Sequence, residues 1–247
     1  MLRGAGRIAR KAVDAMLATI RSGVTEAEVY AEMIKIQIAN GAEPNVFNML
    51  SSGPIEHPSG ELWHLLHGVE QPGSPTTRLL SDGDLTIAEF HTKYGGYRCH
   101  TEYTVYLGDR VPDELQRIWD VSVETLEVSK SALAAGGTLR EAWQMIREPA
   151  KRADLDFVEL GFHAMGLGSP EFPTVIYEEG YGADVFNGAR IGDFVLEEGM
   201  AFGNNIDLHN SRWKSDIGCM LADFMIVRPG QAECLIGTPT EIGHVRP

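Results

Sequence analysis

The sequence predicts an α+β domain whose two halves repeat the same order of elements. The first observation is a pair of capping boxes, Thr25-x-x-Glu28 and Thr138-x-x-Glu141, each lying between two helical stretches. The second is that segments of strand character follow each helix pair. The third is a composition of 43% hydrophobic and 23% charged residues, which is typical of a globular chain. Two helix–helix–strand units in one chain predict halves related by a pseudo-twofold axis.

The first half is predicted to begin with two helices. Apolar residues at near-helical spacing, among them Ile8, Val13 and Met16, predict an amphipathic helix at the N-terminus. The Thr25 capping box begins the second helix. A strand, a long Pro- and Gly-rich loop and a hairpin around Lys-Tyr-Gly-Gly follow. We expect them over residues 45–51, 53–74, and 85–91 with 97–107.

The second half repeats this order with two helices and then strands. The helices are expected over residues 113–135 and 139–153, and the strands over 157–164, 195–204 and 217–227. No low-complexity segment or interdomain linker interrupts the pattern. We therefore predict one domain over residues 1–247.

Composition and charge exclude several functional classes. With 21 basic and 35 acidic residues the net charge is −14, which disfavours nucleic acid and anionic membranes as partners because their phosphates repel an acidic chain. No run of about 18 apolar residues is present. Cys99, Cys219 and Cys234 form no C-x-x-C pair, which fits a reducing compartment. We expect a soluble cytoplasmic protein.

The predicted hairpin brings polar side chains to one face. Alternate residues of a strand share a face, so Glu89 lies with His91 on the first strand and Arg98 with His100 and Glu102 on the second. If this face points inward, carboxyl and imidazole groups converge in a small space. The alternative is the ordinary polar, solvent-facing side of an antiparallel sheet.

Four ordered motifs resemble the creatinase/aminopeptidase superfamily, also called peptidase M24. They are the hairpin region 83–104, the segment 162–173 that contains His163, the segment 199–206 and the segment 220–227. The resemblance implies the pita-bread fold, in which two pseudo-twofold-related helix–helix–strand halves surround a curved antiparallel sheet. It also implies one catalytic-type domain, here expected without a separate N-terminal domain, and a homodimer.

The metal site implied by the resemblance is altered in this chain. Metallopeptidases of the superfamily hold two divalent metals with Asp, Asp, His, Glu and Glu, which fall here on Glu89, His100, His163, Asn205 and Ala222. Alanine offers no ligand atom and neutral asparagine is a poor bridging ligand, so the usual dinuclear site is not expected to form. We accordingly predict no metal and no cofactor.

The resemblance then favours metal-independent, creatinase-like hydrolysis of a small C–N-bonded substrate by His and Glu acid–base chemistry. The predicted catalytic residues are His163, Glu102, His100, Glu89 and His91. The predicted substrate-binding residues are His57, His64, His67, Glu171 and Asn205, and one of the three loop histidines would act as the base.

Two alternatives remain open. The first is an Xaa-Pro-type aminopeptidase or dipeptidase, or a lyase, with one transition metal held by His91, His100, His163 and either Glu89 or Glu102. The second is a non-catalytic pita-bread binding protein that keeps the fold as an interaction platform.

Overall fold

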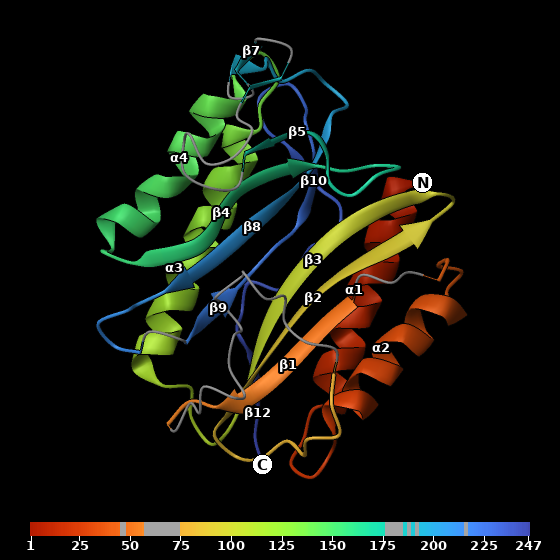
Figure 1. The fold of residues 1–247 in the computed structure, drawn as a ribbon, viewed down its shortest axis with the longest axis vertical. Coiled ribbons are helices and arrows are strands. Elements are labelled where there is room, and N and C mark those ends of the chain that lie inside the picture. The colour runs from red at the N-terminus through yellow and green to blue at the C-terminus, as the bar shows by residue number, and fades with distance from the viewer. Residues whose placement is uncertain (45–47, 57–74, 176–184, 187–188, 191–192, 215–216) are drawn as a thin grey trace.

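The computed structural model describes residues 1–44, 48–56, 75–175, 185–186, 189–190, 193–214 and 217–247 (Figure 1). The helices are α1 (Leu2–Thr19), α2 (Glu26–Ala39), α3 (Asp113–Ala132) and α4 (Leu139–Arg152). The longer strands are β1 (Asn48–Pro54), β2 (Asp84–Tyr94), β3 (Tyr97–Leu107), β4 (Asp156–Ala164), β5 (Glu171–Val175) and β8 (Ala201–His209). The short strands are β6 (Val185–Phe186), β7 (Ala189–Arg190), β9 (Gly218–Met220), β10 (Phe224–Ile226), β11 (Glu233–Cys234) and β12 (Gly243–Val245).

Both predicted capping boxes are present and begin equivalent helices. The Thr25 hydroxyl accepts a hydrogen bond from the Glu28 backbone N–H, and the Glu28 carboxylate accepts one from the Thr25 N–H at 2.8 Å. Thr138 and Glu141 repeat the arrangement at α4. Each box satisfies backbone donors that the first turn of a helix leaves free. The internal repeat seen in the sequence is therefore real at the level of local structure.

The predicted hairpin is formed by β2 and β3. Gly95 and Gly96 connect the strands with φ angles of 59° and 84°, the left-handed values that a tight two-residue hairpin turn needs. Eleven pairs of residues face each other along the two strands, from Asp84 opposite Leu107 to Tyr94 opposite Tyr97. This long hairpin forms the centre of the first half.

The strands of the described residues form two main sheets. The first has the order β1-β2-β3-β12, and the second has the order β11-β10-β8-β4-β5 with β9 also paired to β8. An isolated bridge between Glu102 and Ala222 joins them, and the Ala222 N–H donates to the Glu102 carbonyl at 3.2 Å. Pairing is antiparallel except between β12 and β3, which are parallel.

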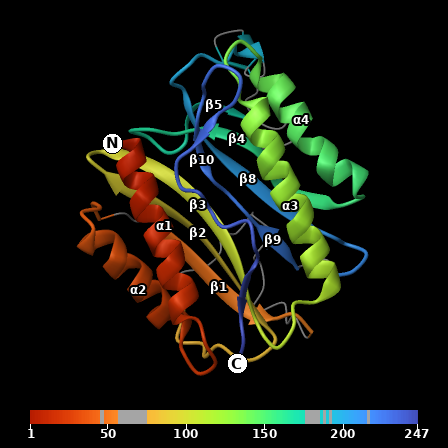
Figure 2. The same ribbon diagram turned by 180° about the vertical axis from the view of Figure 1, so that it is seen from behind.

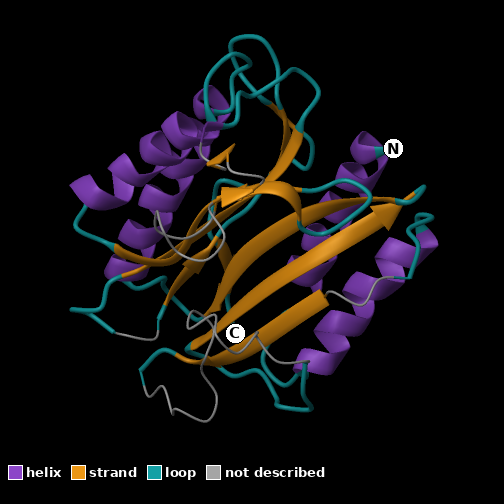
Figure 3. Cartoon of the chain, turned by 45° about the horizontal axis from the view of Figure 1, so that its top comes forward, coloured by secondary structure: helices purple, strands orange, loops and turns teal. Residues whose placement is uncertain are grey.

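Both helix pairs cover the same face of the sheets. Figure 1 shows the strands in front of the helices, and the reverse view in Figure 2 shows α1 and α2 over the first sheet and α3 and α4 over the second. Figure 3 shows the strands of the two halves side by side, with the helix pairs outside them. No helix of the described residues covers the opposite face of the sheets.

The hydrophobic core lies between the helices and the sheets. Its largest fully buried side chains include Trp119, Tyr103, Phe90 and Phe162. The part of the chain that the structure describes contains no helix with the length and apolar character needed to cross a membrane.

Two predicted strand boundaries are wrong. The strand expected over 195–204 begins only at Ala201 and continues to His209, and Val195 makes just an isolated bridge to Thr138. The strand expected over 217–227 is divided into β9 and β10. The division falls at Asp223, whose carboxylate accepts hydrogen bonds from the backbone N–H groups of Phe224, Ile236 and Thr238. These side-chain hydrogen bonds occupy backbone N–H groups that would otherwise pair with a neighbouring strand, so the strand is interrupted here.

Candidate functional site

On one face of the β2–β3 hairpin, three pairs of directly opposite residues each consist of two side chains of the same kind: two acids, two histidines or two bases. Directly opposite residues of antiparallel strands project to the same side, and every second pair shares that side. From the deep end to the tip, the pairs are Glu89–Glu102, His91–His100 and Lys93–Arg98. Like charges directly opposite each other destabilise a hairpin, so this face is built for something other than the stability of the hairpin.

A third imidazole reaches the histidine pair from the other sheet. The ring centroids of His91 and His100 are 5.5 Å apart, and those of His100 and His163 are 4.9 Å apart. His163 lies on β4 opposite Gly203 of β8. A Cβ atom at position 203 would lie 2.7 Å from His163 Nε2, so the absence of a side chain there lets the ring approach His100. All three rings are buried.

The geometry around His91 and His100 fits a metal ion. One ligand atom each from Glu89, His91 and His100 lies within 4.8 Å of the others. His100 Nε2 lies 3.1 Å from Glu102 Oε1, and this contact leaves His100 Nδ1 directed toward Glu89 Oε1 at 3.8 Å. His100 Nδ1 has no hydrogen-bond partner among the described residues. A carboxylate that fixes the far nitrogen of a ligating imidazole is the usual support of a metal-bound histidine.

His91 has similar support on its other side. Its Nδ1 lies 3.4 Å from the Ser169 hydroxyl, in the segment that follows β4. His100 is therefore oriented by Glu102 of its own strand, and His91 by Ser169 of another segment. Nitrogen and carboxylate ligands of this kind suit Zn²⁺ or Fe²⁺ better than Mg²⁺ or Ca²⁺, which prefer oxygen.

Several carboxyl groups lie next to the histidines. Asn205 donates from Nδ2 to Glu102 Oε1 at 2.8 Å and to Glu159 Oε2 at 2.9 Å. The Asp207 carboxyl group lies beside that of Glu102. Glu102, Asn205 and Asp207 are all buried. The amide of Asn205 thus holds two carboxylates from different sheets together.

The environment keeps the imidazoles neutral. Burial lowers the pKa of His100 to about 4, with the Glu159 carboxylate opposing the shift. Burial also lowers the pKa of His91 and of His163 well below the ordinary value, and the neighbouring His100 adds to both shifts. Neutral imidazoles are the form that binds metals and accepts protons.

The environment also raises the pKa of several carboxyl groups. Burial, reinforced by Glu159, raises the pKa of Glu89 to about 8. Burial raises the pKa of Glu102 well above its ordinary range, with the charge of Glu89 adding to the shift. The pKa of Asp207 rises for the same reason, with Glu102 as the nearest contributor. Perturbed groups in this density are typical of a functional site.

The structure brings most of the sequence-predicted site residues together. Glu89, His91, His100, Glu102, His163 and Asn205 all join one cluster at the junction of the two sheets. Glu171 does not take part in these contacts, because its carboxylate accepts the Gly168 backbone N–H and closes the turn before β5. His57, His64 and His67 lie outside the described residues. Their roles in substrate binding stay predictions.

Sequence reasoning missed Glu159. This residue lies on β4 four positions before His163, so strand alternation places both on one face. The signal was therefore available once His163 was chosen. Ala222 contributes only its backbone, because its N–H forms the bridge to Glu102.

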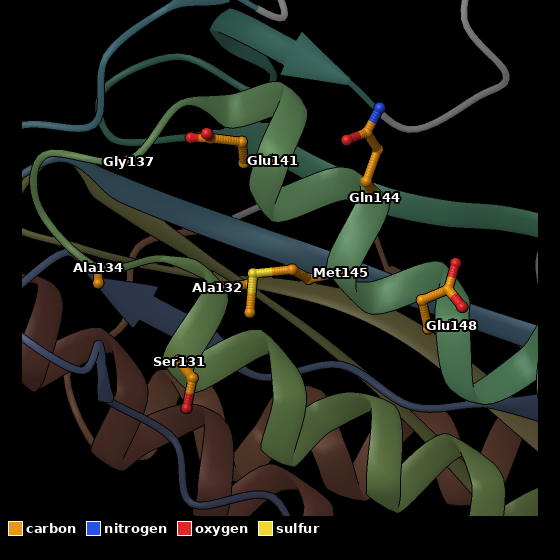
Figure 4. A pocket seen from close by; sticks show the side chains of 8 residues that line it. All are labelled: Ser131, Ala132, Ala134, Gly137, Glu141, Gln144, Met145 and Glu148. Atoms are coloured by element: carbon orange, nitrogen blue, oxygen red, sulfur yellow. The ribbon is translucent and has the colours of Figure 1, made fainter.

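A hollow on the helix side of the molecule is a separate feature (Figure 4). It lies between the end of α3 and the start of α4, and Glu141 in its wall belongs to the capping box. The lining residues are Ser131, Ala132, Ala134, Gly137, Glu141, Gln144, Met145 and Glu148. The hollow contains no histidine and lies on the opposite side of the sheets from the cluster, so we do not regard it as the catalytic site.

Comparison with known proteins gives consistent matches. The model of metallopeptidase family M24 matches residues 1–229. Curated relatives include an Xaa-Pro dipeptidase of Pyrococcus furiosus, 28% identical over 81% of this chain and 51% of that protein. Another is the probable dipeptidase PepE of Mycobacterium tuberculosis, 25% identical over 89% of this chain and 52% of its own length. The chain therefore spans about half the length of the curated relatives it matches.

Solved structures with the same fold include dipeptidase PepE from Mycobacterium ulcerans. It has a TM-score of 0.79 and 23% identity, covering 100% of this chain and 59% of that chain. Methionine aminopeptidase from Rickettsia prowazekii has a TM-score of 0.74 and 16% identity, covering 95% of both chains. These matches confirm the pita-bread α+β fold that the sequence predicts.

Proposed function

This chain belongs to metallopeptidase family M24, and from that premise we propose that it is a metal-dependent hydrolase of small peptide-like C–N bonds. The observation that carries the proposal is the meeting of Glu89, His91 and His100 at the junction of the two sheets. The relatives named as dipeptidases support a peptidase reading more than a metal-independent, creatinase-like one. We therefore set aside the metal-independent, creatinase-like hypothesis from the sequence. The peptidase that the sequence offered as an alternative becomes the leading hypothesis.

In this proposal Glu89, His91 and His100 hold one metal ion. When bound, the ion supplies Lewis-acid polarisation of the substrate carbonyl and an activated water. Glu102 accepts the hydrogen bond of His100 Nε2 and thereby presents Nδ1 toward Glu89. The two-metal ligand set implied by the sequence resemblance does not fit, because Ala222 has no ligand atom and the neutral amide of Asn205 is a poor bridging ligand between two cations.

His163 is the proposed proton carrier. Burial keeps its imidazole neutral at pH 7, and its Nδ1 has no hydrogen-bond partner within the described ranges. The neutral ring can accept a proton from the attacking water and return it to the leaving nitrogen. Water adds to the carbonyl carbon and the C–N bond breaks, giving a carboxylic acid and an amine. His163 ends each cycle in the form in which it began.

The test compares metal-loaded and chelated protein. We expect hydrolysis of glycylproline or alanylalanine after loading with Zn²⁺, Co²⁺, Mn²⁺ or Fe²⁺, loss after chelation and recovery on adding the metal back. His100→Ala should lower kcat/KM by at least about 100-fold, because removing a ligand removes the ion or distorts its position. His244→Ala is the matched control, since His244 hydrogen-bonds Gly108 at the far end of the hairpin.

Two results would overturn the proposal. Hydrolysis of creatine by the chelated protein would restore the metal-independent hypothesis. Failure of the metal-loaded protein to hydrolyse any dipeptide or creatine would favour the non-catalytic binding protein.

A further inference from the structure

Asn205 stands at a position where the superfamily resemblance implies a metal ligand, and here it makes a different set of contacts. It lies on β8 opposite Gly161 of β4, and only 3% of its surface is exposed. Its Nδ2 donates to Glu102 Oε1 at 2.8 Å and to Glu159 Oε2 at 2.9 Å. Glu102 belongs to the first sheet and Glu159 to the second. The amide therefore uses both of its hydrogens to connect the two sheets.

The neighbours of Asn205 determine which way its amide faces. Carboxylate oxygens accept hydrogen bonds, so both neighbours require the Nδ2 hydrogens rather than the amide oxygen. A glutamate at position 205 would instead present two more oxygens to Glu102 and Glu159, and three acidic groups would repel one another. Asn205 and Glu159 are therefore compatible with each other in a way that an acid at position 205 would not be.

The pairing of β4 with β8 explains how Glu159 reaches this amide. Glu159, Gly161 and His163 alternate onto one face of β4. Across the ladder, Asn205 faces Gly161 and His163 faces Gly203, so each polar side chain lies opposite a residue without one. The register of the two strands shifts in the stretch that contains Glu159, and a bulge of this kind redirects side chains.

The hydrogen bond from Asn205 decides how Glu102 meets His100. Glu102 Oε1 lies 3.1 Å from His100 Nε2 and also accepts from Asn205 Nδ2. An oxygen held as an acceptor is the unprotonated oxygen of its carboxyl group, also when Oε2 carries a proton. His100 Nε2 is then the donor, so the single proton of the neutral imidazole is on Nε2. Its Nδ1 keeps the lone pair and faces Glu89 Oε1 at 3.8 Å.

We propose that Asn205 is a positioning residue that sets the tautomer of His100 through Glu102. Asn205 holds Glu102 Oε1 as an acceptor, and this oxygen in turn holds the proton on His100 Nε2. The opposite tautomer would place a hydrogen on Nδ1, the nitrogen that faces the proposed metal position. The inference rests on the proposed function only where the metal enters, because the tautomer belongs to the metal-free protein. Position 205 thus supports a ligand instead of being one.

The main test measures the tautomer in metal-free protein near pH 7.5. Nitrogen-15 NMR of histidine-labelled protein distinguishes a ring nitrogen that carries hydrogen from one with a lone pair. The signals lost in His100→Ala assign the ring. In the wild type we expect a single tautomer of His100, with the proton on Nε2. Asn205→Leu has a similar volume but no donor, so it should show a mixture of both tautomers.

Metal affinity is the second measurement. Titration with Co²⁺, followed by the visible spectrum, should show an affinity lower by about 10-fold or more in Asn205→Leu, the usual effect of removing a group that supports a metal ligand. Glu159→Gln keeps an oxygen acceptor for Asn205, so it should keep the single tautomer of His100.

Asn204→Leu is the matched control for a purely structural effect. Asn204 is the preceding residue of β8, is fully buried and points to the opposite face, where it accepts the Asp223 backbone N–H at 2.8 Å. Its replacement should lower Tm without changing the tautomer of His100 or the Co²⁺ affinity. Thermal unfolding establishes which variants are folded, and Glu159→Gln is the second control.

The outcomes separate this inference from the proposed function. A wild-type His100 with its proton on Nδ1, or with both tautomers, would overturn the inference whether or not any variant folds. An Asn205→Leu protein that keeps the single Nε2–H tautomer would also overturn it and leave the hydrolase standing. A tautomer that depends on Asn205, in a protein that neither binds Co²⁺ nor hydrolyses dipeptides, would overturn the hydrolase and keep the role of Asn205.

Discussion

His91 and His100 lie directly opposite each other on β2 and β3, with ring centroids 5.5 Å apart and a ring nitrogen of each close to Glu89. Two imidazoles at this distance tolerate each other because neither is charged near neutral pH. The same neutrality leaves nitrogen lone pairs available to a metal. The pair therefore connects the electrostatics of the hairpin with the chemistry proposed for it.

Metal binding should stabilise the fold, because an ion held by β2 and β3 binds the native state preferentially. At a metal concentration of 100 times Kd the gain is about 2.7 kcal/mol, which corresponds to a rise in Tm of roughly 5–10 °C for a chain of this size. Differential scanning calorimetry with and without Zn²⁺ measures it. His91→Ala should lose most of the shift and His244→Ala should keep it. An equal shift in both variants would place the ion elsewhere.

The pH dependence of the metal-free protein follows from the same cluster. Glu89 has a pKa of about 8 in the folded state against an ordinary value of 4.5, so its contribution to stability is present at low pH and is lost as pH rises toward 8. The lowered pKa of His100 acts in the opposite direction, but only below about 6.5. Between pH 6.5 and 8, the loss of stability caused by Glu89 is therefore not offset by His100.

We therefore expect chelated protein to lose stability between pH 6.5 and pH 8. Glu89 alone accounts for about 2 kcal/mol over this interval, which lowers Tm by roughly 4–8 °C. Glu89→Gln should flatten the profile, while the control Glu32→Gln, at a half-exposed carboxylate of α2 away from the cluster, should not. A wild-type profile that is level or rises over this interval would contradict the assignment of a raised pKa to Glu89.

The hairpin and its site face could be predicted because both depend on local rules. Strand alternation fixes which residues share a face, and Gly95-Gly96 fixes the turn, so Glu89, His91 and His100 were found from sequence alone. The meeting with His163 is a contact between sheets and came from the resemblance. Alternation along β4 places Glu159 on the face of His163, but its hydrogen bond with Asn205 depends on how β4 pairs with β8.

Segment boundaries in the second half were less predictable for a physical reason. The run 217–227 is apolar enough to suggest one strand, yet the Asp223 carboxylate binds three backbone N–H groups and divides it. Such side-chain competition depends on the distant segment that contains Ile236 and Thr238. A pattern confined to neighbouring residues does not contain that information.

Asp223 should therefore be a determinant of stability rather than of chemistry. Asp223→Ala leaves three buried N–H groups without an acceptor, which we expect to lower the free energy of unfolding by about 3 kcal/mol or more. Asp223→Asn keeps one oxygen acceptor and should lose less. Urea unfolding measures both, with the exposed Asp109→Ala as control. A loss below about 1 kcal/mol in Asp223→Ala would show that the C-terminal segment is held by other contacts.

Gly203 offers a test of how closely the rings must approach. A Cβ at this position would lie 2.7 Å from His163 Nε2 and 3.1 Å from His100 Cβ, so Gly203→Ala must displace the His163 ring. We expect metal affinity and kcat to fall by about tenfold or more, with a change in the visible spectrum of the Co²⁺-loaded protein.

The matched control for this substitution is Gly137→Ala. The nearest atom to a Cβ there is 3.6 Å away, which is ordinary van der Waals contact, so this variant should keep both the affinity and the spectrum. Circular dichroism should show that each variant is folded. If Gly203→Ala binds Co²⁺ with the wild-type affinity and spectrum and turns over dipeptide at the wild-type rate, the contact between His163 and His100 has no part in the reaction. In that case His91 and Glu89 would have to support His100 without help from the second sheet.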